Sequence, residues 1–255
     1  MAERTVNPQL RSFVLGIDRF AVWLGQHWLA AFLVSYGIIV FGPFLAPIFM
    51  RLGATGPADA VYFFYSFLCH QLPERSVFLF GPKPMYSYAE IKAVWPLDGF
   101  EGLRQFVGNA TMGYKVAWSD RMISTYGGLW LGGLIYALLG KRTPRISLLV
   151  WILVGVLPIG LDGLTHMLND VLAGTTGTGF RDTNSWLQAL TMNALPQSFY
   201  SGDQFGSFNS WARWITGFTF SLTTILMAFP LIERSMQDLA ASAEYARTRA
   251  RARTR

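Results

Sequence analysis

Two short polar clusters at the ends of long apolar runs hold the residues whose types suit chemistry. One is residues 69–71 (Cys-His-Gln), and the other begins at Asp162. Asp162, His166 and Asp170 follow each other at i, i+4 and i+8, so they share one face of a helix. That spacing suits metal ligation, with or without the neighbouring thiolate, or a short proton relay. Ionisable groups at a bilayer boundary are costly to desolvate and usually mark function.

Three arginines lie next to predicted outer membrane boundaries, at positions Arg75, Arg121 and Arg213. Their planar forks of N–H donors can clamp a phosphate, a carboxylate or a lipid headgroup. The alternative is a set of internal salt bridges with Glu74, Asp120 and Asp162. The sequence has no Ser-His-Asp, nucleophile-elbow, Rossmann or Walker pattern. Its single cysteine excludes an intrachain disulfide and a cysteine-rich zinc cluster.

Four long uncharged runs predict the helices that position these groups. Only 14% of the 255 residues are charged, against roughly 25% in an ordinary soluble domain. A helix of about 20 apolar residues crosses a bilayer core of about 30 Å. The runs are Trp28–Met50, Met122–Gly140, Ile146–Leu161 (completed by residues 162–166) and Trp214–Ile232. They predict a helical membrane protein.

Positive charge predicts the orientation of these spans. The loop 141–145 has three positive charges and no acid, and residues 247–255 contain five arginines. Under the positive-inside rule both segments are cytoplasmic. Four spans then place both termini inside, in a multi-pass protein of the cell membrane. The long connections 51–121 and 162–213 face outside.

We therefore expect three parts. Residues 1–27 form an amphipathic helix in the cytoplasmic interface, residues 28–232 form the membrane domain, and residues 233–255 form a basic cytoplasmic tail. The tail is expected to attract anionic lipid headgroups, at about 1 kcal/mol per basic residue, or else to be a disordered, solvated segment. It has no base-reading element, so nucleic acid is not an expected partner.

Local signals complete the predicted architecture. A short apolar helix from about Pro57 to Gln71 is too short to span and is expected at the interface or re-entrant. Short helices are expected around residues 90–95 and 100–107. Gly128-x-x-x-Gly132 permits close helix packing, here within the chain's own bundle. The fold class is thus all-α, a four-span helical membrane bundle with an N-terminal interfacial helix and two long outer loops.

Residues 69–71 followed by Arg75-Ser76 resemble the Cys-His-Gln…Arg-Ser signature of an uncharacterised family of small multi-pass membrane proteins, a domain of unknown function. Residues 119–128 resemble that family's Cys-x-Arg-Cys-x-Gly-x-Tyr-x-Gly, and residues 158–166 its Pro…Asp-Gly-x-Thr-Gln. Residues 209–217 resemble its Asn…Arg-x-x-Thr-Gly. The resemblance implies a membrane protein and supplies no established activity.

Departures from that family's pattern bear on metal binding. Ser119 and Met122 stand where the pattern has two cysteines, so a soft-metal site would lack two thiolates. The arginine, aspartate, tyrosine and asparagine positions survive, which favours a polar or anion-binding site. We expect no cofactor and no bound transition metal, with Asp162 held by Arg121 or Arg213.

These residues are expected to converge near the outer face. The candidate ligand-binding set is Cys69, His70, Gln71, Arg75, Ser76, Asp120, Arg121, Tyr126, Asp162, His166, Asn209 and Arg213. The leading hypothesis is a binding or accessory membrane subunit that holds an anionic ligand or a partner, such as another membrane subunit. The alternative is a membrane-embedded enzyme with Asp162 and His166 as base or metal ligands. A transporter is disfavoured, because four spans show no evident inverted repeats.

Overall fold

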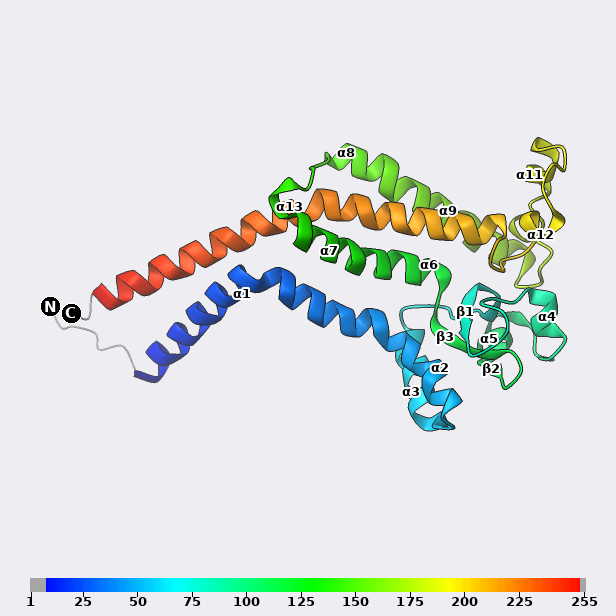
Figure 1. Cartoon of the computed structure of the whole chain (residues 1–255), viewed down its shortest axis with the longest axis horizontal. Coiled ribbons are helices and arrows are strands. Elements are labelled where there is room, and N and C mark those ends of the chain that lie inside the picture. The colour runs from blue at the N-terminus through cyan, green and yellow to red at the C-terminus, as the bar shows by residue number, and fades with distance from the viewer. Residues whose placement is uncertain (1–7, 253–255) are drawn as a thin grey trace.

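The structure, a computed structural model, describes residues 8–252. The ends of the expected N-terminal part and basic tail, residues 1–7 and 253–255, lie outside the described residues. Four helices are long and apolar enough to cross a membrane, judged by length and composition: Ser12–Arg51, Asp120–Leu139, Leu148–Ala173 and Phe208–Arg249. These four candidate spans, called spans below, overlap the four predicted runs, and they form the expected all-α bundle (Figure 1).

The first spanning region contains the breaks that its sequence predicts. Helix α1 (Pro8–Phe41) leaves helical geometry at His27 (φ −124°, ψ 17°), where the amphipathic segment was expected to end. Two prolines then favour the 3-10 turn η1 (Gly42–Phe44) before helix α2 (Leu45–Arg51). From Pro8 onward the N-terminal segment is therefore helical as expected, and it continues into the first span through a kink.

Small residues let the long C-terminal helix α13 (Phe208–Ala252) pack closely against the second and third spans. The second span comprises α6 (Asp120–Met122), π-helical η3 (Ile123–Gly127) and α7 (Gly128–Leu139). A Cβ added at Gly128 would lie 2.8 Å from Ser221 Oγ, and one at Gly132 would lie 2.7 Å from Ile225 Cγ1. The Gly128-x-x-x-Gly132 motif therefore packs inside the chain's own bundle, as expected.

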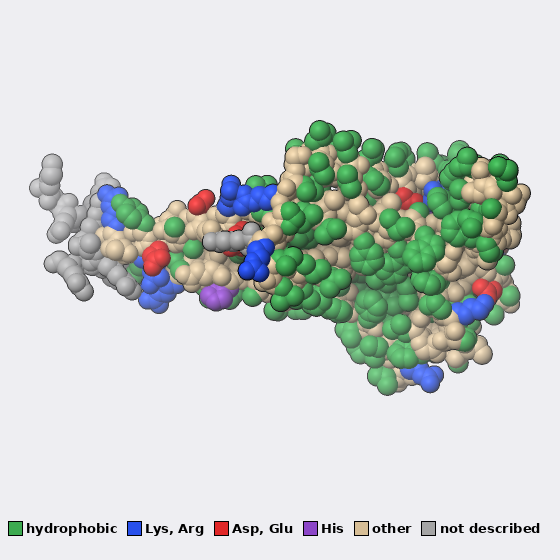
Figure 2. Space-filling view, turned by 45° about the horizontal axis from the view of Figure 1, so that its top comes forward, with side chains coloured by type: hydrophobic (Ala, Val, Ile, Leu, Met, Phe, Trp, Pro, Cys, Tyr) green, Lys and Arg blue, Asp and Glu red, His purple; other side chains and the backbone are tan. Residues whose placement is uncertain are grey.

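The third span repeats this close approach on another face of α13. It comprises α8 (Leu148–Val150), π-helical η5 (Trp151–Val156) and α9 (Leu157–Ala173), after the turn η4 (Gly140–Arg142). A Cβ at Gly155 would lie 2.3 Å from Thr223 Oγ1. Apolar side chains cover the middle of the molecule (Figure 2), and Leu138 is 87% exposed.

The first long connection contains a small antiparallel sheet that the sequence interpretation did not foresee. From here on, outer denotes the end of the bundle opposite the start of α1 and the end of α13, without reference to a side of the membrane. Its strands are β1 (Ser76–Leu79), β2 (Gly108–Asn109) and β3 (Gly113–Ser119), in the order β1-β3-β2. Buried and half-buried residues alternate over only four positions in β1, and β3 is mostly buried, so the sequence carries little alternating signal. The predicted short helices are present as α4 (Tyr88–Lys92) and α5 (Gly99–Arg104).

The remaining outer elements are short helices. They are α3 (Thr55–Ser66), η2 (Pro73–Arg75), α10 (Phe180–Thr183), α11 (Ser185–Leu190) and α12 (Gln197–Tyr200). Figure 1 shows both long connections at one end of the bundle, and the start of α1 and the end of α13 at the other. This arrangement agrees with an even number of spans. The side of the membrane that each end occupies stays a prediction.

Candidate functional site

Buried charges meet where α6 and α13 begin and α9 ends, beneath η2, α10 and the loop 201–207. Four arginines and four aspartates form two adjoining networks of ion pairs there, which we together call the charge lattice. One contains Arg75, Arg213, Asp120, Asp170 and Asp203, and the other contains Arg121, Arg181 and Asp162. The backbone N–H of Arg121 joins the two by donating to Asp120 Oδ1. The equal numbers of positive and negative groups compensate one another away from water, which a buried charge requires.

Arg213 and Arg75 hold the two oxygens of one carboxylate. Arg213 is 2% exposed; its Nε donates to Asp120 Oδ1 at 2.6 Å, and its Nη1 donates to Asp203 Oδ1 at 2.5 Å. Arg75 donates from Nε to Asp203 Oδ2 at 2.8 Å. Its two terminal nitrogens donate to both oxygens of Asp170 at 2.7 Å each. This bidentate geometry is the strongest form of such a pair.

These ion pairs keep Asp203 and Arg75 charged. Burial alone would raise the pKa of Asp203, but the guanidiniums of Arg75 and Arg213 hold it well below its ordinary value. Burial also opposes the charge of Arg75, but Asp203 and Asp170 outweigh that effect and raise the pKa of Arg75. Both residues therefore stay ionised over the physiological pH range.

Asp162, within α9, lies between two other arginines. Its Oδ2 accepts from Arg121 Nη2 and its Oδ1 from Arg181 Nη2, both at 2.7 Å. The same Arg181 nitrogen lies 3.0 Å from His166 Nε2. Because a guanidinium can only donate, we assign His166 Nε2 as the acceptor and place the ring proton on Nδ1. That buried Nδ1 has no partner within residues 8–252.

The sequence-predicted residues do converge, but with partly different partners. Asp162 is held by Arg121 as expected, and its second partner is Arg181, whereas the expected alternative, Arg213, pairs elsewhere. Of the three acids considered as internal partners in the alternative to an anion clamp, Asp162 pairs with Arg121 and Asp120 pairs with Arg213. Arg75 does not pair with the adjacent Glu74, because it reaches across the outer loops instead.

Sequence reasoning missed Arg181 and Asp203, which complete the lattice. Neither belongs to a recognised motif, and Asp203 lies 128 residues from its partner Arg75. The available signal was the small number of charged residues. In a chain with only 14% charged residues, a buried charged group needs a partner of opposite sign.

Three members of the candidate set support the site from outside it. Asn209 Nδ2 donates to the carbonyls of Arg181 (2.7 Å) and Gly202 (3.0 Å), so it joins two outer loops to the start of α13. Ser76 Oγ donates to a carbonyl at the start of η2. Tyr126 stacks on Trp118 with ring centroids 4.9 Å apart.

The segment that carries Cys69 and His70 is not helical. Helix α3 ends at Ser66, so the predicted helical end at Gln71 was wrong. Gln71 adopts a left-handed φ of 56°. Cys69 Sγ accepts from the backbone N–H groups of Gln71 (3.4 Å) and Ser119 (3.3 Å). This buried sulfur therefore ties the segment to β3.

A buried lysine, Lys115 on β3, fastens the same segment. Its Nζ donates to Gln71 O at 2.8 Å and to Arg104 O at 2.6 Å. Burial lowers the pKa of Lys115 to about 7. The sequence interpretation assigned this residue to a loop and gave it no role, because the sheet that buries it was not foreseen.

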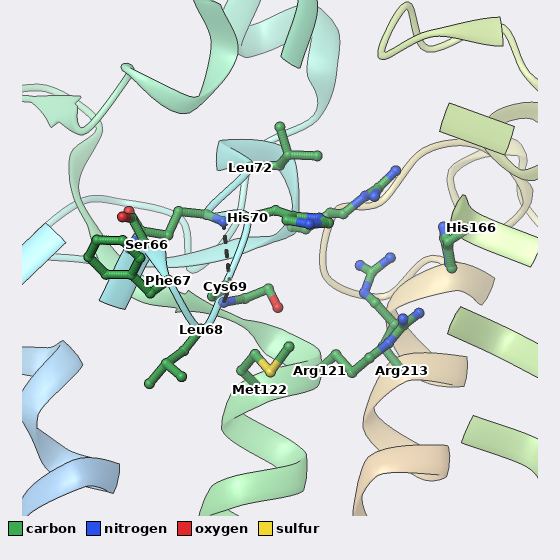
Figure 3. Close-up of a pocket in the computed structure, with 13 residues that line it drawn as sticks. Ser66, Phe67, Leu68, Cys69, His70, Leu72, Arg121, Met122, His166 and Arg213 are labelled. Atoms are coloured by element: carbon green, nitrogen blue, oxygen red, sulfur yellow. Dashed lines mark hydrogen bonds between the residues drawn. The ribbon is translucent and has the colours of Figure 1, made fainter. Parts of the chain in front are cut away.

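A cavity of about 380 Å³ opens between this segment and the charge lattice. Its basic lining residues are His70, Arg75, Arg121, His166 and Arg213, and no carboxylate side chain from the described residues lines it. Figure 3 shows Arg121, Arg213 and His166 on one side of it and Leu68 and Met122 on the other. We call it the donor cavity, because its polar wall is rich in N–H groups.

Metal ligation has no geometric support in the part of the chain that the structure describes. No group of three or more His, Cys, Asp or Glu side chains there could hold a metal ion. The predicted absence of a transition metal stays a prediction, which elemental analysis of the purified protein tests directly.

Comparison with known proteins gives one informative relative. The chain is 26% identical over 142 residues to the uncharacterised protein MJ1492 of Methanocaldococcus jannaschii, covering 53% of this chain and 70% of that protein. No family model matches the chain, and no solved structure matches it. These findings agree with an uncharacterised group of unknown function, so the activity must be argued from the site.

Proposed function

We propose that this protein binds an anionic amphiphile, with the charged head of the ligand in the donor cavity. One observation carries the proposal: three guanidiniums line a cavity that no carboxylate side chain of the described residues enters. The aspartates of the charge lattice neutralise these guanidiniums from outside the cavity. The N–H groups of the arginines remain as donors on the cavity side. Phosphate and carboxylate heads are acceptors whose geometry matches such forks.

Unused donors support this reading. Arg121 lines the cavity and donates only one side-chain hydrogen bond in the described structure, from Nη2 to Asp162. Its buried Nε has no partner, and neither does Nδ1 of His166. Buried donors without acceptors are costly, and an anionic ligand that accepts from them would remove that cost.

The rim of the donor cavity supports an amphiphile over a free anion. Phe67 is 74% exposed and Leu68 is 44% exposed, and both line the cavity together with Met122. Met122 lies at the outer end of the second candidate span. An acyl chain leaving the cavity would meet these apolar side chains, whereas a free anion would gain nothing from them.

The enzyme hypothesis gains less from the geometry. Both oxygens of Asp162 already accept from arginines at 2.7 Å. A substrate proton would have to displace one of these charge-assisted bonds before Asp162 could act as a base. We therefore retain binding as the proposed role.

Calorimetric titration in a neutral detergent tests the proposal. Dioctanoyl phosphatidate should bind, and dioctanoyl phosphatidylcholine and inorganic phosphate should bind at least about tenfold more weakly, the equivalent of one charge-assisted bond. Arg121→Gln should weaken phosphatidate binding by about tenfold, and it leaves Asp162 paired with Arg181. Arg51→Gln, at an exposed arginine that ends α2, is the matched control.

Equal binding by wild type and Arg121→Gln would overturn the site. Equal binding of phosphatidylcholine would remove the anionic head from the proposal, and equal binding of inorganic phosphate would remove the acyl chain. Each of these three results would therefore contradict a different part of the proposal.

The proposed orientation places the donor cavity on the outer side of the cell membrane, with both termini cytoplasmic and the basic tail near anionic headgroups. Single reporter cysteines test it. Arg142→Cys should react only from the cytoplasmic side, and Met192→Cys, at a residue 88% exposed, only from outside. The native Cys69 is buried and serves as the unlabelled background. The opposite pattern would invert the topology.

A further inference from the structure

A second cavity, of about 300 Å³, shares Arg75 with the donor cavity. Its lining includes four carboxylates, Glu74, Asp170, Asp182 and Asp203, and neutral oxygen-bearing side chains such as Thr175 and Gln204. We call it the acceptor cavity. It is built from the outer connections and the outer end of α9, apart from the apolar rim of the donor cavity.

Three of these oxygens have no hydrogen-bond partner. Glu74 is only 5% exposed, and its Oε2 is unpartnered. Gln204 Oε1 and Thr175 Oγ1 are buried and unpartnered as well. The orientation of the Gln204 amide is fixed, because its Nε2 donates to Ser201 O at 2.9 Å. Three buried acceptors around one cavity indicate a ligand that donates hydrogen bonds.

Two of the four carboxylates are also uncompensated. Asp170 and Asp203 pair with arginines, whereas Glu74 and Asp182 form no ion pair within residues 8–252. Asp182 Oδ2 accepts only neutral donors, from an asparagine amide at 3.1 Å and a backbone N–H at 2.8 Å. The cavity therefore retains negative charge that a cation would neutralise.

The volume of the acceptor cavity and the arrangement of its carboxylates indicate which kind of cation fits. A bare metal ion needs several carboxylates converging at bonding distance, and no such group exists in the described chain. A volume of about 300 Å³ instead lies at the lower end for small organic ligands. An ammonium group supplies three N–H donors to unpartnered oxygens.

We infer that the acceptor cavity binds a compact organic diamine, whose ammonium groups meet Glu74 and Asp182 and donate to the unpartnered oxygens around them. Two uncompensated carboxylates match two positive charges. This inference does not depend on the anionic amphiphile proposed for the donor cavity, and either can fail alone.

Binding should weaken as the pH falls, because burial raises the pKa of Glu74 to about 7. Burial also raises the pKa of Asp182. The charged or titratable groups around Glu74 are Arg75, Tyr88, Lys115, Asp170, Asp182 and Asp203. Of these, Lys115 becomes positively charged as the pH falls through about 7. Its charge then repels a bound cation, so it also weakens binding at low pH.

Calorimetric titration of the full-length protein in neutral detergent with 1,4-diaminobutane tests the inference. We expect binding at pH 8 and an affinity about tenfold lower at pH 5.5, as Glu74 takes up its proton. Glu74→Gln, which keeps shape and removes charge, should lower the affinity at pH 8 about tenfold. Glu101→Gln, at an exposed carboxylate of α5, should leave it unchanged.

A gain-of-function variant keeps the test independent of folding. Ser198 is exposed at the edge of this cavity, so Ser198→Asp adds a carboxylate without disturbing buried structure and should tighten diamine binding about threefold. Equal affinity of wild type and Glu74→Gln, or no heat from wild type, would overturn the inference. Binding of calcium chloride with no response to the diamine would overturn the assignment of an organic ligand.

Discussion

The two cavities that meet at Arg75 border the same charge lattice but show opposite chemistry. On the side of the spans, the donor cavity presents guanidiniums and unpartnered N–H groups beside apolar side chains. On the side of the outer connections, the acceptor cavity presents unpartnered oxygens and two uncompensated carboxylates. The comparison teaches that ion pairs make buried charge tolerable, while the groups left unpaired at each end decide what can bind.

Removing a paired charge should have the largest effect. Arg213→Met would leave Asp120 and Asp203 with one partner fewer in a buried site, where Arg213 is 2% exposed. Breaking such a pair typically costs about 3–5 kcal/mol. We expect little monodisperse protein from detergent extracts and a strongly lowered unfolding temperature. Arg51→Met, at an exposed arginine, is the control, and wild-type stability in Arg213→Met would contradict the lattice as a source of stability.

Removing the unpaired charge of Glu74 should instead stabilise the fold. The folded-state pKa of Glu74 is about 7, above the ordinary value of 4.5, so the folded protein binds the extra proton between these values. Ionised Glu74 therefore destabilises the fold fully above pH 7 and not at all below pH 4.5.

Glu74→Gln should accordingly stabilise the protein at pH 8 by up to about 3 kcal/mol, and by progressively less towards pH 5. Thermal unfolding at pH 8, 6.5 and 5 measures this trend, with Glu101→Gln as the control. Destabilisation at pH 8 would mean that Glu74 has a partner and that the contrast between the cavities is wrong. Diamine binding and stability should thus change in opposite directions in this variant.

The sequence allowed much of the lattice and little of the acceptor cavity to be predicted. Arg75, Arg121 and Asp162 were recognisable because each lies at the end of an apolar run, where an ionisable residue is conspicuous. Their convergence followed from the even-span topology. The pairing of Arg75 with Asp203, 128 residues away, depends on how two loops fold over the bundle, which no local pattern encodes.

The acceptor cavity escaped prediction for a related reason. Glu74 and Lys115 look like ordinary charged loop residues, and only the unforeseen sheet and the turn η2 bury them. Local spacing predicts helices through their 3.6-residue period, but it does not predict which polar side chains a short irregular sheet covers. Cys69 was likewise read as a helical residue, although its sulfur fastens an extended segment.

The smallest expected effect is coupling between the two cavities. Arg75 lines both, so an anion in one and a cation in the other would be separated by about one side chain. Opposite charges at that distance attract by roughly 0.5–1 kcal/mol at an effective dielectric between those of protein and water. Saturating 1,4-diaminobutane should therefore tighten phosphatidate binding about threefold, and phosphatidate should tighten diamine binding by the same factor, because coupling free energies are reciprocal.

Sodium chloride at equal ionic strength is the control. In Glu74→Gln the coupling should be weaker at diamine concentrations that just saturate the wild type, because the variant binds the diamine about tenfold less tightly. Antagonism between the two ligands would instead indicate one shared site, and the distinction between donor and acceptor cavities would not survive it.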